Sequence, residues 1–260
     1  MKDFTLPKYE LLLRTLRDAG FRFVTLEQYV TEQPADRVCI LRHDVDARPE
    51  SAVIMALAEQ EMGIRASYYF RSELPSNSPA CIQQVVAAGH ELGYHYEDFV
   101  MAHGDVEVAW EHFKRKLEYF RQFYPVRTIC AHGGPLSRYD SKDLWDYHDY
   151  RLLGIICEPY IDLDYRKIFY LTDTGRRWDG YKVSVRDKIP HAQLGWLAQG
   201  LSFHGTNDII AAAQEGRLPE HILLSSHPQR WIGDRGQWVW ELATQNVKNY
   251  AKMLLIKLRK

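Results

Sequence analysis

The stretch VCILRHDVD, residues 38–46, joins a short apolar run directly to a charged segment. The apolar part is typical of a strand that is buried on both faces of a sheet. Because successive side chains of an extended chain point to opposite faces, we expect Arg42, Asp44 and Asp46 on one face and His43 on the other. Charged groups at the end of a buried strand are costly unless they are paired, hydrogen-bonded or bound to a metal. The segment is therefore either part of a metal-assisted or acid–base site or an exposed turn with solvated charges.

The composition limits the class of protein to which this chain can belong. With 260 residues, of which 46% are apolar, the chain can bury a large core, so one α/β barrel or two small domains would both fit. The net charge of −1 gives no reason to expect nucleic-acid binding. The first ten residues lack the pattern of a signal peptide, and no apolar run is long enough to form a transmembrane segment. We therefore expect a soluble cytoplasmic protein.

Strand-like and helix-like segments alternate along most of the chain. This alternation predicts a parallel sheet with helices outside, closed or nearly closed into a barrel. No linker or repeat divides the sequence, so we expect a single domain over residues 1–260 with its core at about 36–232 and a helix from each terminus packed on it. Residues 133–200 are the least regular and are expected to form long loops. The expected strands are residues 21–26, 38–41, 66–70, 90–95, 128–132, 154–161, 167–171 and 222–226.

The expected strands end in side chains that can do chemistry. Active sites of barrels built from strand–helix units lie at the edge where the strands end, and they are assembled from several of those ends. A core would not place histidines and aspartates at one end of many strands by chance, so the pattern predicts an active site at this edge. The polar residues at the ends of the expected strands are Asp44, Asp46, Arg71, His95, His132, Asp173 and His227.

Two histidines follow expected strands and carry distinct predictions. His95 shares a face with Glu97 if its strand continues, and both could reach one ion, because zinc accepts imidazole nitrogen and carboxylate oxygen. His132 is followed by Gly133 in a tight turn, which would let backbone amides approach a ligand and stabilise an oxyanion. We therefore expect His132 and Gly133 to contact substrate.

His227 ends a very apolar strand and is a candidate proton donor or acceptor. Asp173 lies in the segment TDTGRRWDG, close to two arginines. The sequence leaves open whether Asp173 orients a catalytic histidine or pairs with an arginine.

Lysine and arginine residues end the last expected helix, which covers residues 237–258. Cations at a helix C-terminus are favourable by about 0.3–1 kcal/mol each, which is sufficient to explain Lys257, Arg259 and Lys260. Weak contact with an anionic membrane surface is the alternative.

The ordered motifs LRHDVD, GHELGYH, AHGGP, TDTGRRWDG and SSHPQRW resemble those of the polysaccharide deacetylase family, which shares a homology domain with nodulation-type chitooligosaccharide deacetylases. The resemblance covers about residues 36–232 and is greatest to a bacterial branch associated with surface-glycan loci. It implies a distorted (β/α) barrel of about seven strands. It also implies removal of an acetyl group from an acetylated sugar or glycan precursor with one divalent metal, most often Zn²⁺.

The resemblance also implies a role for each matching residue. Asp44 corresponds to the general base, Asp46 and His95 to metal ligands, and His227 to the general acid. Asp173 matches the acidic residue that tunes that acid.

The chain departs from the family pattern at two positions. The family has a second ligand histidine four residues after the first, where this chain has Phe99, so Glu97 is the nearest substitute. The family's third motif offers an arginine to tune the base, and here Arg42 or Arg71 would have to serve. A sugar would stack on aromatic side chains at the rim, for which the candidates are Tyr94, Trp178 and Trp231. Arg71 is a further candidate to bind the substrate.

Three functions remain open at this stage. The first is metal-dependent deacetylation of an N-acetylated sugar. The second is carbohydrate binding by a pseudoenzyme whose metal site has degraded. The third is hydrolysis of another amide, on a formylated or cyclic substrate, by the same fold.

Overall fold

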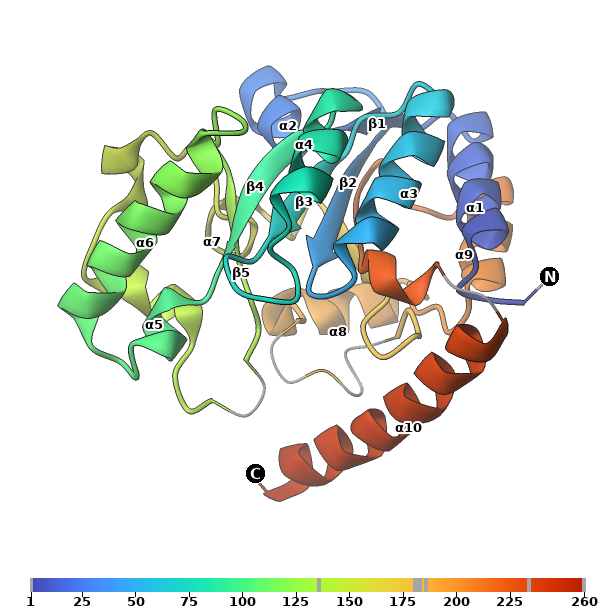
Figure 1. The fold of residues 1–260 in the computed structure, drawn as a ribbon. Helices are drawn as coiled ribbons and strands as arrows, with labels where there is room; N and C mark the ends of the chain where they lie inside the picture. The colour runs from blue at the N-terminus through green and yellow to red at the C-terminus, as the bar shows by residue number, and fades with distance from the viewer. Residues whose placement is uncertain (1, 135–136, 180–183, 185–186, 233–234, 259–260) are drawn as a thin grey trace.

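A computed structural model describes residues 2–134, 137–179, 184, 187–232 and 235–258 of the chain. It contains one sheet of seven strands, all paired in parallel, in the order β5-β4-β3-β2-β7-β6, with β1 beside β2 (Figure 1). The sheet is a curled half-barrel, and no pairing between β5 and β6 closes it within the described ranges. This confirms the predicted α/β fold, a distorted barrel of about seven parallel strands. The strands are β1 Arg22–Val24, β2 Val38–Val45, β3 Ser67–Phe70, β4 Glu91–Tyr96, β5 Ile129–Ala131, β6 Phe169–Thr172 and β7 His221–Ser226.

Helices surround the sheet and connect its strands, as parallel pairing requires. Local signals explain where several of them begin: Thr25 and Gln28 form a capping box, and Asp105 caps another helix through the amide of Val108. The α-helices are α1 Leu6–Asp18, α2 Leu26–Glu32, α3 Pro49–Glu61, α4 Pro79–Ala87, α5 Asp98–Met101, α6 Val106–Arg121, α7 Pro159–Asp162, α8 Pro190–Ala198, α9 Thr206–Gln214 and α10 Arg235–Leu258. Short 3-10 helices are η1 Ser141–Asp146, η2 Tyr150–Leu153 and η4 Pro228–Arg230.

Strand β2 is central and wholly buried. Its first half pairs with β1, its second half pairs with β3, and most of its length pairs with β7. The side chain of His43 points toward α3, where its Nε2 lies 2.8 Å from Oε1 of Glu59. Arg42 and Asp44 point to the opposite side, where they form an ion pair. The predicted alternation of faces along this strand is confirmed.

Some expected elements differ from the sequence prediction. Residues 154–161 do not form a strand: Cys157 makes an isolated bridge and α7 then begins at Pro159, because Glu158 caps its first amides. Helices α2 and α8 were not predicted. Within the described part of the chain, no helix has the length and apolar character needed to cross a membrane. Pro135 and Gly180, which end two of the motifs, and Arg259 and Lys260 lie outside the described residues, as does the side chain of Lys257.

Candidate active site

A cavity of about 100 Å³ lies at the edge of the sheet where the strands end. Parallel pairing brings these ends together, since β2 and β4 flank β3, and β5 and β7 lie outside them. Most of the strand-end residues that were predicted to form an active site line the cavity, namely Asp44, Asp46, His95, His132 and His227. Gly133 lines it as well.

Asp46 is the centre of a compact group of potential metal ligands. Its Oδ1 atom lies 3.5 Å from Nε2 of His95 and 3.7 Å from Nε2 of His132. The potential ligand atoms of the three residues lie within 4.8 Å of one another. The group joins the end of β2 to β4 and to the residue that follows β5.

Hydrogen bonds fix which ring nitrogens face Asp46. Nδ1 of His95 donates to the backbone carbonyl of Cys130 at 2.9 Å, and a carbonyl can only accept. Nδ1 of His132 donates to Oε2 of Glu97 at 2.8 Å. The Nε2 atom of each ring is therefore the nitrogen that faces Asp46.

The carboxylate of Asp46 has one oxygen atom that no hydrogen-bond donor satisfies in the described structure. Its Oδ1 atom is buried and accepts no hydrogen bond within the described residues. Burial acts to raise the pKa of Asp46, but the surrounding imidazoles of His95, His132 and His227 lower it well below its usual range. Three potential ligand atoms that converge, one of them a buried carboxylate oxygen without a hydrogen bond in the described structure, fit a cation. Two imidazole nitrogens and one carboxylate oxygen are a donor set that zinc and similar ions accept, with positions left for water or substrate.

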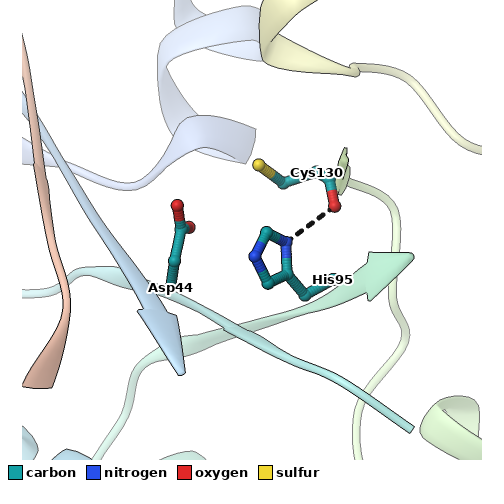
Figure 2. A group of neighbouring side chains, drawn as sticks. All are labelled: Asp44, His95 and Cys130. Atoms are coloured by element: carbon teal, nitrogen blue, oxygen red, sulfur yellow. Dashed lines mark hydrogen bonds between the residues drawn. The ribbon is translucent and has the colours of Figure 1, made fainter. Parts of the chain in front are cut away.

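A second group shares His95 but fits an ion poorly. Asp44, His95 and Cys130 also bring potential ligand atoms within 4.8 Å of one another. Figure 2 shows the Asp44 carboxylate on one side of the imidazole, while the Cys130 carbonyl receives the hydrogen bond on the other. Burial raises the pKa of the Cys130 thiol, so a metal-binding thiolate is disfavoured. Asp44 is already paired with Arg42.

Glu97 does not belong to the group around Asp46. The sequence predicts Glu97 as the third ligand, but its Oε1 atom accepts from Arg71 at 2.6 Å and its Oε2 atom accepts from His132. Burial acts to raise the pKa of Glu97, but His132 and Arg71 lower it to about 2. His132 occupies the third position instead, and Glu97 orients it. Carboxylate–histidine pairs of this kind fix the ring orientation of metal-ligating histidines.

Asp44 is held at one oxygen and free at the other. Its Oδ2 atom accepts from Nη2 of Arg42 at 2.8 Å, whereas its buried Oδ1 has no hydrogen-bond partner in the described structure. Arg42 is fully buried, and the same Nη2 atom also donates to the hydroxyls of Tyr160 and Tyr170. Of the two arginines considered for this contact, Arg42 makes it and Arg71 does not.

His227 and Asp173 form a second fixed pair. Nδ1 of His227 lies 2.6 Å from Oδ1 of Asp173, and Nε2 lies 3.7 Å from Oδ2 of Asp46. Asp173 also accepts from Arg230 and from the indole of Trp231. Asp173 therefore contacts both a histidine and an arginine, the two kinds of partner that the sequence left open. Burial acts to raise the pKa of Asp173, but Arg230 and His227 lower it.

The three aromatic side chains predicted to bind a sugar do not line the cavity. Tyr94, Trp178 and Trp231 are each less than 5% exposed and pack inside the molecule. Each uses its polar atom internally: Tyr94 donates to Asp98, Trp178 to Thr206 and Trp231 to Asp173. Arg71, also predicted to bind substrate, is occupied by Glu97. The prediction that these three rings bind a sugar is wrong because apolar packing buries them, which sequence position alone did not reveal. Contact of Arg71 with substrate stays a prediction.

Asp187 is a cavity residue that the sequence did not single out. Its carboxylate accepts from the hydroxyls of Tyr160, Tyr170, Thr172 and Thr174. Burial acts to raise its pKa, but Arg42 and His227 lower it below the usual range. Asp187 lies in a loop rather than at a strand end, so strand periodicity carried no signal for it.

The comparisons with known proteins found similar structures but no match of sequence. No family model and no curated protein sequence matches the chain. The structure is similar to that of a CE4 family pseudoenzyme from Bacillus anthracis, with 11% identity over 84% of this chain and 62% of that one, and a TM-score of 0.45. It is also similar to PdaA, a family 4 carbohydrate esterase from Bacillus subtilis, with 10% identity over 91% of this chain and 83% of that one, and a TM-score of 0.40.

A mutant of the peptidoglycan deacetylase PdaC from Bacillus subtilis matches with 12% identity over 86% of this chain and 98% of that one, and a TM-score of 0.39. The chain spans 62% of the length of the Bacillus anthracis protein. These identities are too low to transfer a role to any residue of this chain.

Proposed function

We propose that this chain is a metal-dependent hydrolase that removes the acetyl group from an N-acetylated sugar. The observation that carries the proposal is the convergence of Asp46 Oδ1 with the Nε2 atoms of His95 and His132, whose Nδ1 atoms are both engaged by other partners. Asp46, His95 and His132 would hold the ion, and Zn²⁺ suits this donor set. When bound, such an ion polarises a carbonyl and lowers the pKa of a bound water to about 7.

Asp44 would act as the general base. Arg42 binds its Oδ2 atom and keeps that oxygen from the reaction, so the unpartnered Oδ1 is the atom that would take a proton from the attacking water. The ion pair with Arg42 also limits rotation of the carboxylate. The backbone of Gly133 lies on the same wall, where an amide could stabilise the developing oxyanion.

His227 would act as the general acid. Because its Nδ1 atom is bound to Asp173, Nε2 is the atom that faces the cavity and can deliver a proton to the departing amine. Asp173, in turn held by Trp231 and Arg230, keeps the ring in that orientation and stabilises its protonated form. Asp44 lies beside His95 and His227 lies beside Asp46, so the base and the acid would both be close to a substrate held at this group.

The test combines metal analysis with acetate release. Protein purified without chelator should carry a divalent ion, and it should release acetate from a member of a panel of N-acetylated mono- and oligosaccharides. Asp44→Asn should lower turnover by at least about 100-fold while the ion is retained, because only the proton-accepting group is removed.

Other outcomes would identify the other candidate functions. A bound ion and a bound sugar without acetate release would indicate a pseudoenzyme. Hydrolysis confined to formylated or cyclic amides would retain the chemistry and replace the proposed substrate.

A further inference from the structure

Helix α10 turns its polar side toward the protein and its apolar side away from it. Gln245 and Asn249 are buried, and Asn249 donates to the backbone carbonyl of Gly175 in the loop after β6. Trp238 also faces the protein, where its indole donates to the backbone carbonyl of Asp3. Four other large apolar side chains among the described part of the helix are instead highly exposed: Val239 55%, Trp240 68%, Val247 71% and Tyr250 64%.

Helix geometry places these exposed residues on one stripe. At about 100° per residue, Val239, Trp240, Val247 and Tyr250 fall within one arc of about 100°, centred opposite Gln245. Surface helices of globular proteins have the reverse arrangement, with the apolar stripe facing the core. The inverted pattern shows that folding of this chain does not bury the apolar stripe of α10, defined as these four residues.

The charge of the same segment is equally distinctive. Residues 242–260 contain five Lys or Arg and no Asp or Glu, whereas the rest of the chain has 28 Lys or Arg against 34 Asp or Glu. A stripe with tryptophan and tyrosine on a cationic helix is the composition of a helix that lies in the interface of an anionic bilayer. A second copy of α10 fits less well, since pairing would bring the ten cations of residues 242–260, five from each copy, together, and the one acidic residue of the helix, Glu241, already pairs with Arg48.

We infer that α10 docks this protein on the surface of an anionic lipid bilayer, with the stripe of Val239, Trp240, Val247 and Tyr250 inserted at the headgroup level. The inference is independent of the catalytic proposal. Figure 1 shows α10 running past the end of the sheet toward which β2 points, and the helix contacts Gly175 in the loop after β6. Arg48, after β2, pairs with Glu241 of the helix. A docked α10 would therefore hold the cavity edge of the sheet near the membrane.

Vesicle sedimentation of the full chain tests the inference. The protein should sediment with vesicles of phosphatidylcholine containing about 30 mol % phosphatidylglycerol, and at least about tenfold less with phosphatidylcholine alone. Raising the salt from about 50 mM to about 500 mM should also weaken binding, because screening shortens the range of the attraction.

Variants of exposed residues separate the stripe from general surface effects. Replacing Trp240, Val247 and Tyr250 with serine should lower binding to anionic vesicles at least about tenfold while leaving the melting temperature unchanged. The matched control replaces three equally exposed side chains elsewhere with serine, namely Tyr147 (64%), Leu152 (82%) and Leu194 (78%).

Three results would overturn the inference. The first is equal sedimentation with neutral and anionic vesicles. The second is an equal loss of binding in the control variant. The third is a dimer in analytical ultracentrifugation that the Trp240, Val247 and Tyr250 variant dissociates, which would make a second copy the occupant of the stripe.

Discussion

The imidazole ring of His132 lies between two carboxylates and turns one nitrogen toward each of them. Its Nδ1 atom is committed to Glu97, and its Nε2 atom faces Asp46. Phe99, which stands where the resembled family has its second histidine, is buried with its ring against Tyr139. Position 99 therefore offers no imidazole, and it is the imidazole of His132, at the end of the neighbouring strand, that faces Asp46.

His132→Ala should therefore remove bound metal. We expect loss of stoichiometric Zn²⁺, and Glu97→Gln should weaken affinity by about 10–100-fold because it removes only the group that orients the ring. Competition with a chromophoric chelator measures both effects. His103→Ala is the control, since His103 is absent from the groups of potential ligands among the described residues. Unchanged affinity in His132→Ala would exclude it as a ligand.

Part of this site follows from sequence alone. Strand periodicity places Asp44 and Asp46 on one face, and parallel pairing brings His95 to the same edge, so these positions are predictable. The choice between Glu97 and His132 is not, because both lie at that edge. It depends on Arg71, whose guanidinium takes the Glu97 carboxylate, and no sequence pattern gives the direction of that side chain.

At the scale of single elements, the short helix α7 depends on Glu158. The carboxylate accepts from the amides of Tyr160 and Ile161, which open the helix, and from the amide of Ala131 in β5. The apolar character of residues 154–161 predicted a strand here. That prediction did not take into account Glu158 and Pro159, which start the helix. Burial raises the pKa of Glu158 from 4.5 to about 7.

The raised pKa of Glu158 predicts a pH-dependent stability. Between pH 4.5 and 7 the folded protein keeps a proton that the unfolded chain releases, so this contribution is complete below about pH 4.5 and is lost as the pH rises to about 7. The loss should be about 3 kcal/mol. Urea unfolding across this range should show a shallower pH dependence for Glu158→Gln. Asp149→Asn, at the exposed cap of η2, should keep the wild-type slope, and an unchanged slope in Glu158→Gln would contradict the assignment.

The contact between β3 and β4 depends on a glycine. Gly93 pairs with Tyr69, and a Cβ atom at Gly93 would lie 2.2 Å from Cε1 of the Tyr69 ring. Tyr69 is fully buried and its hydroxyl is hydrogen-bonded to Thr128, so the ring has little freedom to move. Gly93→Ala should destabilise the protein by about 1–3 kcal/mol.

A second glycine provides the control for this prediction. A Cβ atom at Gly195 in α8 would meet no described atom within 4 Å, so Gly195→Ala should be neutral or stabilising by up to about 1 kcal/mol. Chemical denaturation measures both variants. Equal effects would show that the Tyr69 contact does not constrain the sheet.

At the scale of the whole molecule, the parallel sheet joins distant segments into one site. The alternation of strands and helices predicts this sheet, and with it the edge where the cavity lies. It does not predict which loop residues reach the cavity, since Asp187 arrives from a segment without periodicity. It also does not predict that the apolar stripe of α10 faces away from the protein. The spacing of apolar residues shows that a helix has an apolar side, but not whether that side packs on the sheet or faces outward.

The assembly of the site from distant segments predicts that metal and folding are coupled. Asp46, His95 and His132 lie close together only in the folded chain, so an ion that they bind favours the folded state. At a free concentration 100 times the dissociation constant, the gain is about 2.7 kcal/mol. That corresponds to a rise of roughly 5–10 °C in melting temperature for a chain of this size.

Thermal unfolding with and without Zn²⁺, after removal of metal by a chelator, measures this coupling. Asp46→Asn should lose the rise, because an amide oxygen carries no charge to offset that of the cation. Asp164→Asn, which changes an exposed carboxylate that pairs with Arg166, should keep it. An equal rise in all three proteins would mean that the ion acts elsewhere on the chain, and the convergence of the three side chains would then need another cation, such as a shared proton, to explain it.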